Sequence, residues 1–248
     1  MSDPEAALSS KAPFPTTRWS RVVAAGDPAE PGARQALEEL CRAYWYPLYA
    51  FIRRKGHDPD RAADLTQEYF ALLLGSDLLA RADRRKGRFR AFLRADCGFF
   101  LAHQAERDRA RKRGGGAPTL SIDARDAEGR YLREPADPGL TAEHLFDRAW
   151  ALSLLDGVLE RLAREHAEAG QSVRFEALRP TLGGGRSTPH AAIAARLGTT
   201  EAAVEAAARR LRGRYRAALR EQIAATLGDP TEAAIDAEIR DLFAVLGG

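Results

Sequence analysis

The sequence has little cysteine. Its two cysteines, Cys41 and Cys97, lie far apart, and neither belongs to a CxxC pair or a Cys/His cluster. This excludes a disulfide-built framework and gives no sign of a zinc site, because both need cysteines grouped at set spacings. We therefore expect no metal and no other cofactor, and a reducing compartment as the location.

Long apolar runs are also absent. No stretch approaches the roughly 20 apolar residues that a membrane-spanning helix needs. The first residues, MSDPEAALSSKAPFP, carry acids and prolines where a secretory signal needs an apolar run. The sequence predicts a soluble, cytoplasmic protein without membrane contact. Its 248 residues, 45% of them hydrophobic, suffice for one large or two small domains with a buried core.

Signatures of catalysis are missing as well. No HExxH motif, nucleophile elbow or carboxylate cluster is present. The glycine loop 183–185 lacks the GxxxxGK[ST] spacing and its lysine, so it is no phosphate cradle. We expect that the protein is not an enzyme. The alternative is that some of its five histidines act as ligands or bases; they are His57, His103, His144, His166 and His190.

The sequence does have a dense positive charge between Arg81 and Arg113. This segment holds twelve basic and four acidic residues, a surplus of eight, whereas the whole chain has a formal net charge of +3. The same segment contains four phenylalanines. Guanidinium groups beside aromatic faces suit unpaired bases, because each nucleotide brings a phosphate and a face to stack on. The segment therefore indicates binding of single-stranded nucleic acid.

Two helical stripes run along this basic segment. Three- and four-residue spacing predicts that one stripe lies in the core; it consists of Phe89, Leu93, Cys97 and Phe100. A second stripe mixes rings with polar groups and is expected to stay open; it consists of Phe92, Asp96, Phe99 and His103. The alternative is that all four phenylalanines are core and the arginines form a solvated face.

A short helix is expected after a Thr17 cap, and two longer helices are expected between it and the basic segment. One runs from Ala33 to Lys55 and bends at Pro47 without ending there. The other starts at the Asp58 cap, runs from Pro59 to Leu74 and closes at Gly75. Its inward face is expected to hold Ala62, Leu65, Tyr69 and Leu72. Its outward face, either a binding patch or an ordinary solvated face, holds Asp64, Gln67, Glu68 and Ala71.

Residues 114–140 are rich in glycine and proline without an apolar period, and we expect an extended linker there. A long helix capped by Thr141 should follow, with a leucine face from Leu145 to Leu162, and then a short helix near Val173–Leu178. The C-terminal helix around Leu242 is expected to cover the second domain.

The segment HAAIAARLGTTEAAVEAAARRLRGRYR has the spacing of a helix-turn-helix. Ala194 lets two helices cross closely, Gly198 takes the positive-φ turn and Val204 packs the second helix on the first. Thr200 is the expected cap of that second helix. The arginines that follow it are expected to contact phosphates.

Taken together, these blocks resemble the extracytoplasmic-function (ECF) sigma factors of bacterial RNA polymerase, in the sigma-70 superfamily, and in particular a subgroup with an enlarged C-terminal domain. The resemblance runs in order from Thr17 through TRWS, ALEELCRAYWYPLYAFIRRKGHDPDRAADLTQEYF, KGRFRAFL, RDRARKRGGG and LFDRAW. It implies an all-α fold of two helical domains joined by a linker. The implied divisions are a disordered N-terminus 1–16, a region 2-like domain 17–113, a linker 114–140, a region 4-like helix-turn-helix domain 141–228 and a C-terminal helix 229–248.

The resemblance also implies function. Such a protein would bind the polymerase core at the clamp of the β′ subunit and direct it to promoter DNA, and an anti-sigma or other regulatory protein is a further implied partner. The residues matching the clamp-binding motif are Asp64, Gln67, Glu68 and Phe70. Those matching the minus-10 DNA segment are Phe89, Arg90, Phe92, Phe99, His103, Gln104, Arg107 and Arg111. Those implied at the minus-35 element are Thr200, Glu201, Glu205, Arg209, Arg210 and Arg214.

The recognition helix departs from the family, because Glu201 and Glu205 stand where relatives often carry basic or amide residues. Glutamate can accept from cytosine but repels phosphate. The alternative function is a stand-alone helix-turn-helix transcriptional regulator, which would leave DLTQEYF and the basic aromatic helix unexplained.

Overall fold

The computed structural model describes residues 33–75, 79, 88–111, 122–133, 139–183, 188–227 and 229–247. Every regular element among these residues is a helix, so the described chain is all-α, as expected. The helices are α2 (Ala33–Arg54), α3 (Pro59–Gly75), α4 (Phe89–Arg111), α5 (Ile122–Arg133), α6 (Ala142–Glu168), α7 (Ser172–Leu178), the short 3-10 helix η2 (Arg179–Leu182), α8 (His190–Leu197), α9 (Glu201–Thr226) and α10 (Glu232–Gly247). None of these helices is long and apolar enough to cross a membrane. The short helix expected after Thr17 lies outside the described residues.

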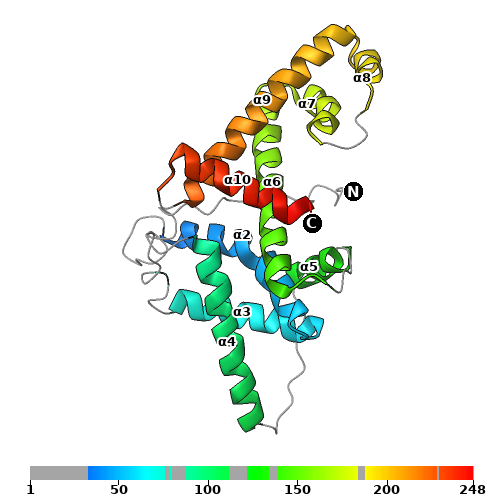
Figure 1. The fold of residues 1–248 in the computed structure, drawn as a ribbon. Coiled ribbons are helices and arrows are strands. Elements are labelled where there is room, and N and C mark those ends of the chain that lie inside the picture. The colour runs from blue at the N-terminus through cyan, green and yellow to red at the C-terminus, as the bar shows by residue number, and fades with distance from the viewer. Residues whose placement is uncertain are drawn as a thin grey trace, which may run out of the picture.

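Helix α6 is the axis of the molecule. Its 27 residues span about 40 Å at the α-helical rise. Helices α2 to α5 surround its N-terminal part, and α7 to α9 lie at its C-terminal part (Figure 1). Thr141 caps it as predicted, its hydroxyl accepting a hydrogen bond from the backbone N–H of His144. The buried surface is wider than the predicted leucine stripe and includes Phe146, Trp150 and Val158, because α6 packs against both halves of the molecule.

Helices α2 and α3 form as predicted. Helix α2 continues through Pro47 and is buried on nearly all sides from Ala43 to Ile52, as expected of a helix that is apolar all round. The Asp58 carboxylate accepts from the backbone N–H of Arg61 and so caps α3. The predicted inward face of α3 is right except at Leu72, which is exposed, while Leu73 is buried in its place.

The expectation of an extended linker is wrong for residues 122–133, which form α5. This helix docks on α2: the Arg53 guanidinium forms two hydrogen bonds of 2.9 Å with the Glu128 carboxylate, and the Tyr49 hydroxyl donates to the same carboxylate at 2.5 Å. The Arg53 contact lowers the pKa of Glu128. Arg130 also lies over the Tyr46 ring at 4.1 Å. Polar and ring contacts with residues far back in the sequence therefore stabilise this segment, although its own sequence has no apolar period.

Helix α10 packs on the second half of the molecule, as predicted, and also contacts the first half. Its Ile235 and Leu242 are buried, and it packs on both α6 and α9. Its Glu238 also reaches the start of α4, in the first half of the molecule. The buried hydrophobic residues form one contiguous cluster from α2 to α10. The expected pair of domains separated by a linker is therefore not confirmed.

Candidate nucleic-acid interface

Two helices joined by a tight turn, α8 and α9, form where the sequence predicts a helix-turn-helix. Helix α8 ends at Gly198, whose φ of +60° is left-handed, and the Thr199 N–H bonds back to the Ala194 carbonyl at 3.0 Å. A Cβ at Gly198 would meet nothing within 4 Å, so this position needs glycine for its conformation and not for space. Ala194 and Val204 are buried where the two helices cross, and the Thr200 hydroxyl caps α9 by accepting from the Ala203 N–H.

The first turns of α9 are open to solvent. Thr200, Glu201 and Glu205 are all exposed. Glu205 pairs with Arg209 one turn later at 3.1 Å, which ties up part of its charge. Arg214 is exposed but forms an ion pair of 2.5 Å with Glu165 of α6.

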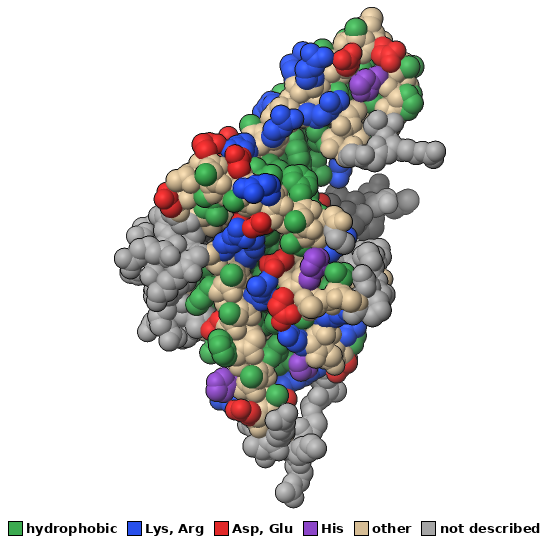
Figure 2. All heavy atoms as spheres, in the orientation of Figure 1, with side chains coloured by type: hydrophobic (Ala, Val, Ile, Leu, Met, Phe, Trp, Pro, Cys, Tyr) green, Lys and Arg blue, Asp and Glu red, His purple; other side chains and the backbone are tan. Residues whose placement is uncertain are grey.

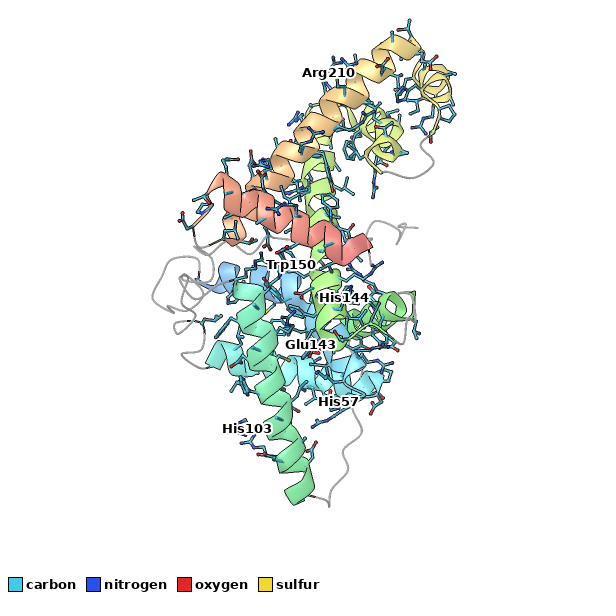
Figure 3. All side chains as sticks on the ribbon, viewed as in Figure 1. His57, His103, Glu143, His144, Trp150 and Arg210 are labelled. Atoms are coloured by element: carbon cyan, nitrogen blue, oxygen red, sulfur yellow. The ribbon has the colours of Figure 1, made fainter. Side chains whose placement is uncertain are left out.

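Three more arginines of α9 form no ion pair with another described residue; they are Arg210, Arg212 and Arg216. Blue side chains follow α9 in Figure 2, and Arg210 is labelled on it in Figure 3. Beyond its exposed N-terminal turn, this helix therefore presents guanidinium groups to solvent on more than one side.

The outer half of α4 presents part of the predicted open stripe. Phe99 is 70% exposed, and His103 and Arg107 are exposed beyond it. Figure 3 shows His103 on the side of α4 that faces away from the other helices. Gln104 donates a hydrogen bond of 2.6 Å to Glu68 of α3. The side chain of Arg111 lies outside the described residues.

The inner half of α4 follows the predicted core stripe and differs from the DNA surface that the resemblance implies. Phe89, implied at the DNA surface, is buried and packs edge-on against Tyr44 with ring centroids 5.7 Å apart. Phe92 is half-buried and stacks on Phe89 at 6.1 Å. The Arg90 guanidinium lies 4.2 Å from the ring centre of Trp150. Phe89 and Arg90 therefore cannot touch a strand in this conformation.

Acidic side chains from other helices explain why Arg90 is covered. Asp147 of α6 contacts Arg90 at 3.5 Å, and it also pairs with Arg94. Glu238 of α10 pairs with Arg90 as well, and its oxygen lies 2.6 Å from Nε of Arg88. Burial and the neighbouring Arg88 lower the pKa of Arg90 to about 10, so its guanidinium is still charged at neutral pH. Sequence reasoning missed these partners, although Glu238 and Asp241 stand three residues apart on a predicted helix.

The acidic face of α3 is only partly as predicted. Gln67 and Glu68 are exposed and Asp64 is half-buried. Glu68 also contacts Arg61 at 3.4 Å. Phe70 is buried and stacks on Trp45 with centroids 5.9 Å apart, so it belongs to the core and not to the exposed patch.

The histidines do not come together. His57 is half-buried beside Arg61, and burial and that charge lower its pKa. The Nδ1 atom of His166 lies 2.7 Å from the Leu162 carbonyl oxygen, and its ring lies against Phe175. Within the described ranges, no three His, Cys, Asp or Glu side chains are grouped as a metal ion would need.

Comparison with known proteins adds no relative. No known protein family, no curated protein and no solved structure matches this chain. What the chain does must therefore be inferred from its own surfaces and sequence.

Proposed function

We propose that this chain is a sigma-type initiation factor, which binds the core of bacterial RNA polymerase and directs it to promoter DNA. It would read duplex DNA with α8 and α9 and a separated strand with α4, and it would contact the polymerase through α3. The assignment draws on the sequence resemblance to ECF sigma factors, and the geometry of three exposed surfaces supports it.

The observation that carries DNA binding is the α8–α9 pair. A left-handed Gly198 and the cap residue Thr200 set the two helices at a tight turn, which leaves the first residues of α9 exposed. In helix-turn-helix proteins these residues enter the major groove. Glu201 is then placed to read a base, whereas Arg210 is placed to bind a phosphate, which carries no base information.

The outer half of α4 supports contact with a separated strand. An exposed phenylalanine ring has no packing role, but each stacked base contributes about 1 to 3 kcal/mol. Phe99 with Arg107 two turns later offers both a ring and a charge. Because Phe89 and Arg90 are covered, this surface is smaller than the sequence implies.

A stand-alone helix-turn-helix regulator is the second candidate. The burial of Phe70, Phe89 and Arg90 favours it, since three residues that the resemblance places at polymerase or DNA are in the core. Both candidates share α8 and α9. They differ in whether the exposed Gln67 and Glu68 bind a protein.

Polymerase co-purification separates the two candidates. We expect the tagged full-length chain to retain bacterial core polymerase, and Gln67→Ala with Glu68→Lys to lose most of it, because the charge of the exposed face is reversed. The matched control is Gln171→Ala with Glu168→Lys, which makes the same changes at exposed positions at the far end of α6. Equal retention by all three proteins would refute the polymerase assignment and leave the regulator. Far-ultraviolet circular dichroism should be the same for all three.

A further inference from the structure

The start of α4 is held by acidic residues from two other helices. Glu238 of α10 is 0% exposed and pairs with both Arg88 and Arg90. One turn later, Asp241 contacts Arg88 at 2.6 Å. From the opposite side Asp147 of α6 contacts Arg90 and Arg94. Red and blue side chains are mixed where α10 meets α4 in Figure 2, whereas blue predominates along α9.

The contact of α10 with α4 is separate from the contacts that hold α10 elsewhere. On another side of the helix, Glu232 and Asp236 bind Arg220 of α9. Ile235 and Leu242 are buried against the body of the protein. The acids of α10 thus form two sets, one directed at α9 and one, Glu238 with Asp241, directed at α4.

The α4 contact adds little net stability to the fold. Both carboxylate oxygens of Glu238 are buried beside guanidinium groups. A buried ion pair gives little net stability, because the loss of hydration offsets most of the attraction. If the helices separate, water takes over both charges. Separating α10 from α4 therefore costs far less free energy than removing one partner of the ion pair while the other stays buried.

One of these arginines has a second possible ligand. Arg88 directly precedes α4, whose outer half exposes Phe99 and Arg107, so a strand lying along the Phe99 side of the helix would bring a phosphate to Arg88. Arg90 lies about two and a half turns before Phe99 and so on the opposite side of α4. Guanidinium groups bind phosphate and carboxylate oxygens through the same geometry. A strand and the acids of α10 would thus compete for the same donors, and each would weaken the other by the same factor.

We propose that α10 is an autoinhibitory element in which Glu238 and Asp241 occupy Arg88 and keep α4 from binding a single strand along its full length. This inference rests on the proposed function, because it assumes that α4 binds nucleic acid. Release of α10 from α4 completes the basic surface. While α10 is docked, only the outer half of α4 is available, so wild-type binding is weak.

The test is the affinity of full-length variants for a fluorescein-labelled oligodeoxythymidine strand of ~12 nucleotides, within the range that one groove covers. Fluorescence anisotropy is measured over a series of salt concentrations. Glu238→Gln with Asp241→Asn should bind roughly tenfold tighter at low salt. Its salt dependence should be steeper by about 0.7 in the slope of log K against log salt, the value for one arginine released to phosphate.

The matched control is Glu232→Gln with Asp236→Asn. It makes the same charge change on the same helix but releases Arg220 of α9 in place of the α4 arginines. We expect its affinity and slope to equal those of the wild type. A gain as large as that of the Glu238 variant would overturn the proposal, since net charge alone would then explain the effect.

Two further variants keep the test decisive. Asp241 is half exposed, so Asp241→Asn alone should leave the fold intact, even if the Glu238 variant does not fold. It should give a smaller change of slope in the same direction, because Glu238 still contacts Arg88. Adding Arg88→Gln to the double variant should abolish the gain. If the gain persists without this arginine, the proposed contact is not its cause.

The outcomes also separate this inference from the proposed function. If every variant binds the strand as the wild type does, and Phe99→Ala weakens all of them, α4 binds nucleic acid but α10 does not inhibit it. If no protein in the series binds the strand at any salt concentration, both the single-strand function of α4 and the inhibition are refuted. Retention of core polymerase by the same preparations is measured independently.

Discussion

The two arginine-rich helices of this protein, α4 and α9, are similarly basic in sequence, but their arginines have different surroundings in the structure. At the start of α4 the guanidinium groups of Arg88, Arg90 and Arg94 meet carboxylates of α6 and α10. In the middle of α9, Arg210 and Arg212 are exposed and form no ion pair with another described residue. A count of charges along the chain does not distinguish these helices.

The difference shows what decides whether a basic residue is available to a ligand. On α4 the acids come from residues more than 50 positions away, which no local pattern contains. In the first half of α9 the acids in contact are in the same helix or at the far end of α6, and acids of α10 contact Arg220 near its end. Whether the arginines of a helix are available to a ligand thus depends on the residues packed against them in the fold, and not on the local density of charge in the sequence.

The largest expected effect contrasts Arg90 with Arg210. Arg90→Ala should lower the free energy of unfolding by about 3 to 5 kcal/mol, because Glu238 is left buried without this partner. Arg210→Ala, on the exposed face of α9, should change it by no more than about 0.5 kcal/mol. Urea denaturation followed by circular dichroism measures both.

A compensating variant makes this contrast more specific. Arg90→Leu with Glu238→Leu removes both buried charges and should recover most of the lost stability, since apolar residues often replace a buried ion pair without cost. A loss below about 1 kcal/mol for Arg90→Ala alone would mean that the two helices do not differ in the way the structure indicates.

Sequence patterns predicted much of the fold because most of its helices are locally encoded. The Asp58, Thr141 and Thr200 caps and the left-handed Gly198 each depend on residues within one turn. Apolar spacing likewise identified the core stripe of α4, in which Phe89, Leu93 and Cys97 are buried and Phe100 is half-buried. These signals need no knowledge of the rest of the chain.

The failures have the opposite origin. Helix α5 has no apolar period and is held by Arg53, Tyr49 and Tyr46, which lie far back in the chain. Phe70 was assigned to a binding motif by position, but Trp45 of α2 covers it. Apolar periodicity depends only on residues within one helix. It cannot predict which face of that helix will be covered by a residue from a distant part of the sequence.

A middle-sized effect concerns how α9 is presented. Gly198→Ala should destabilise the protein by about 1 to 2 kcal/mol, because a side chain at φ +60° strains the backbone even where space is free. Gly213, inside α9, is the matched control. Its alanine variant meets no atom within 4 Å and should stabilise the helix by about 0.5 to 1 kcal/mol. Thermal unfolding of the two variants should therefore shift in opposite directions, and a shift in the same direction would contradict the role of the left-handed turn.

The smallest expected effect lies within α9 and contrasts a free arginine with a paired one. Arg210→Ala should reduce the slope of log K against log salt for duplex DNA by about 0.9, the value for one phosphate contact. Arg214→Ala should reduce it by clearly less, because Glu165 already binds that guanidinium at 2.5 Å. Glu165→Gln removes this competitor, so in that background the Arg214 effect should rise toward that of Arg210. None of these changes should alter the preferred sequence, since a phosphate contact carries no base information. Equal slopes for Arg210→Ala and Arg214→Ala in the wild-type background would show that an intramolecular carboxylate does not restrain an exposed arginine. The contrast between α4 and α9 would then have to rest on burial and not on ion pairing.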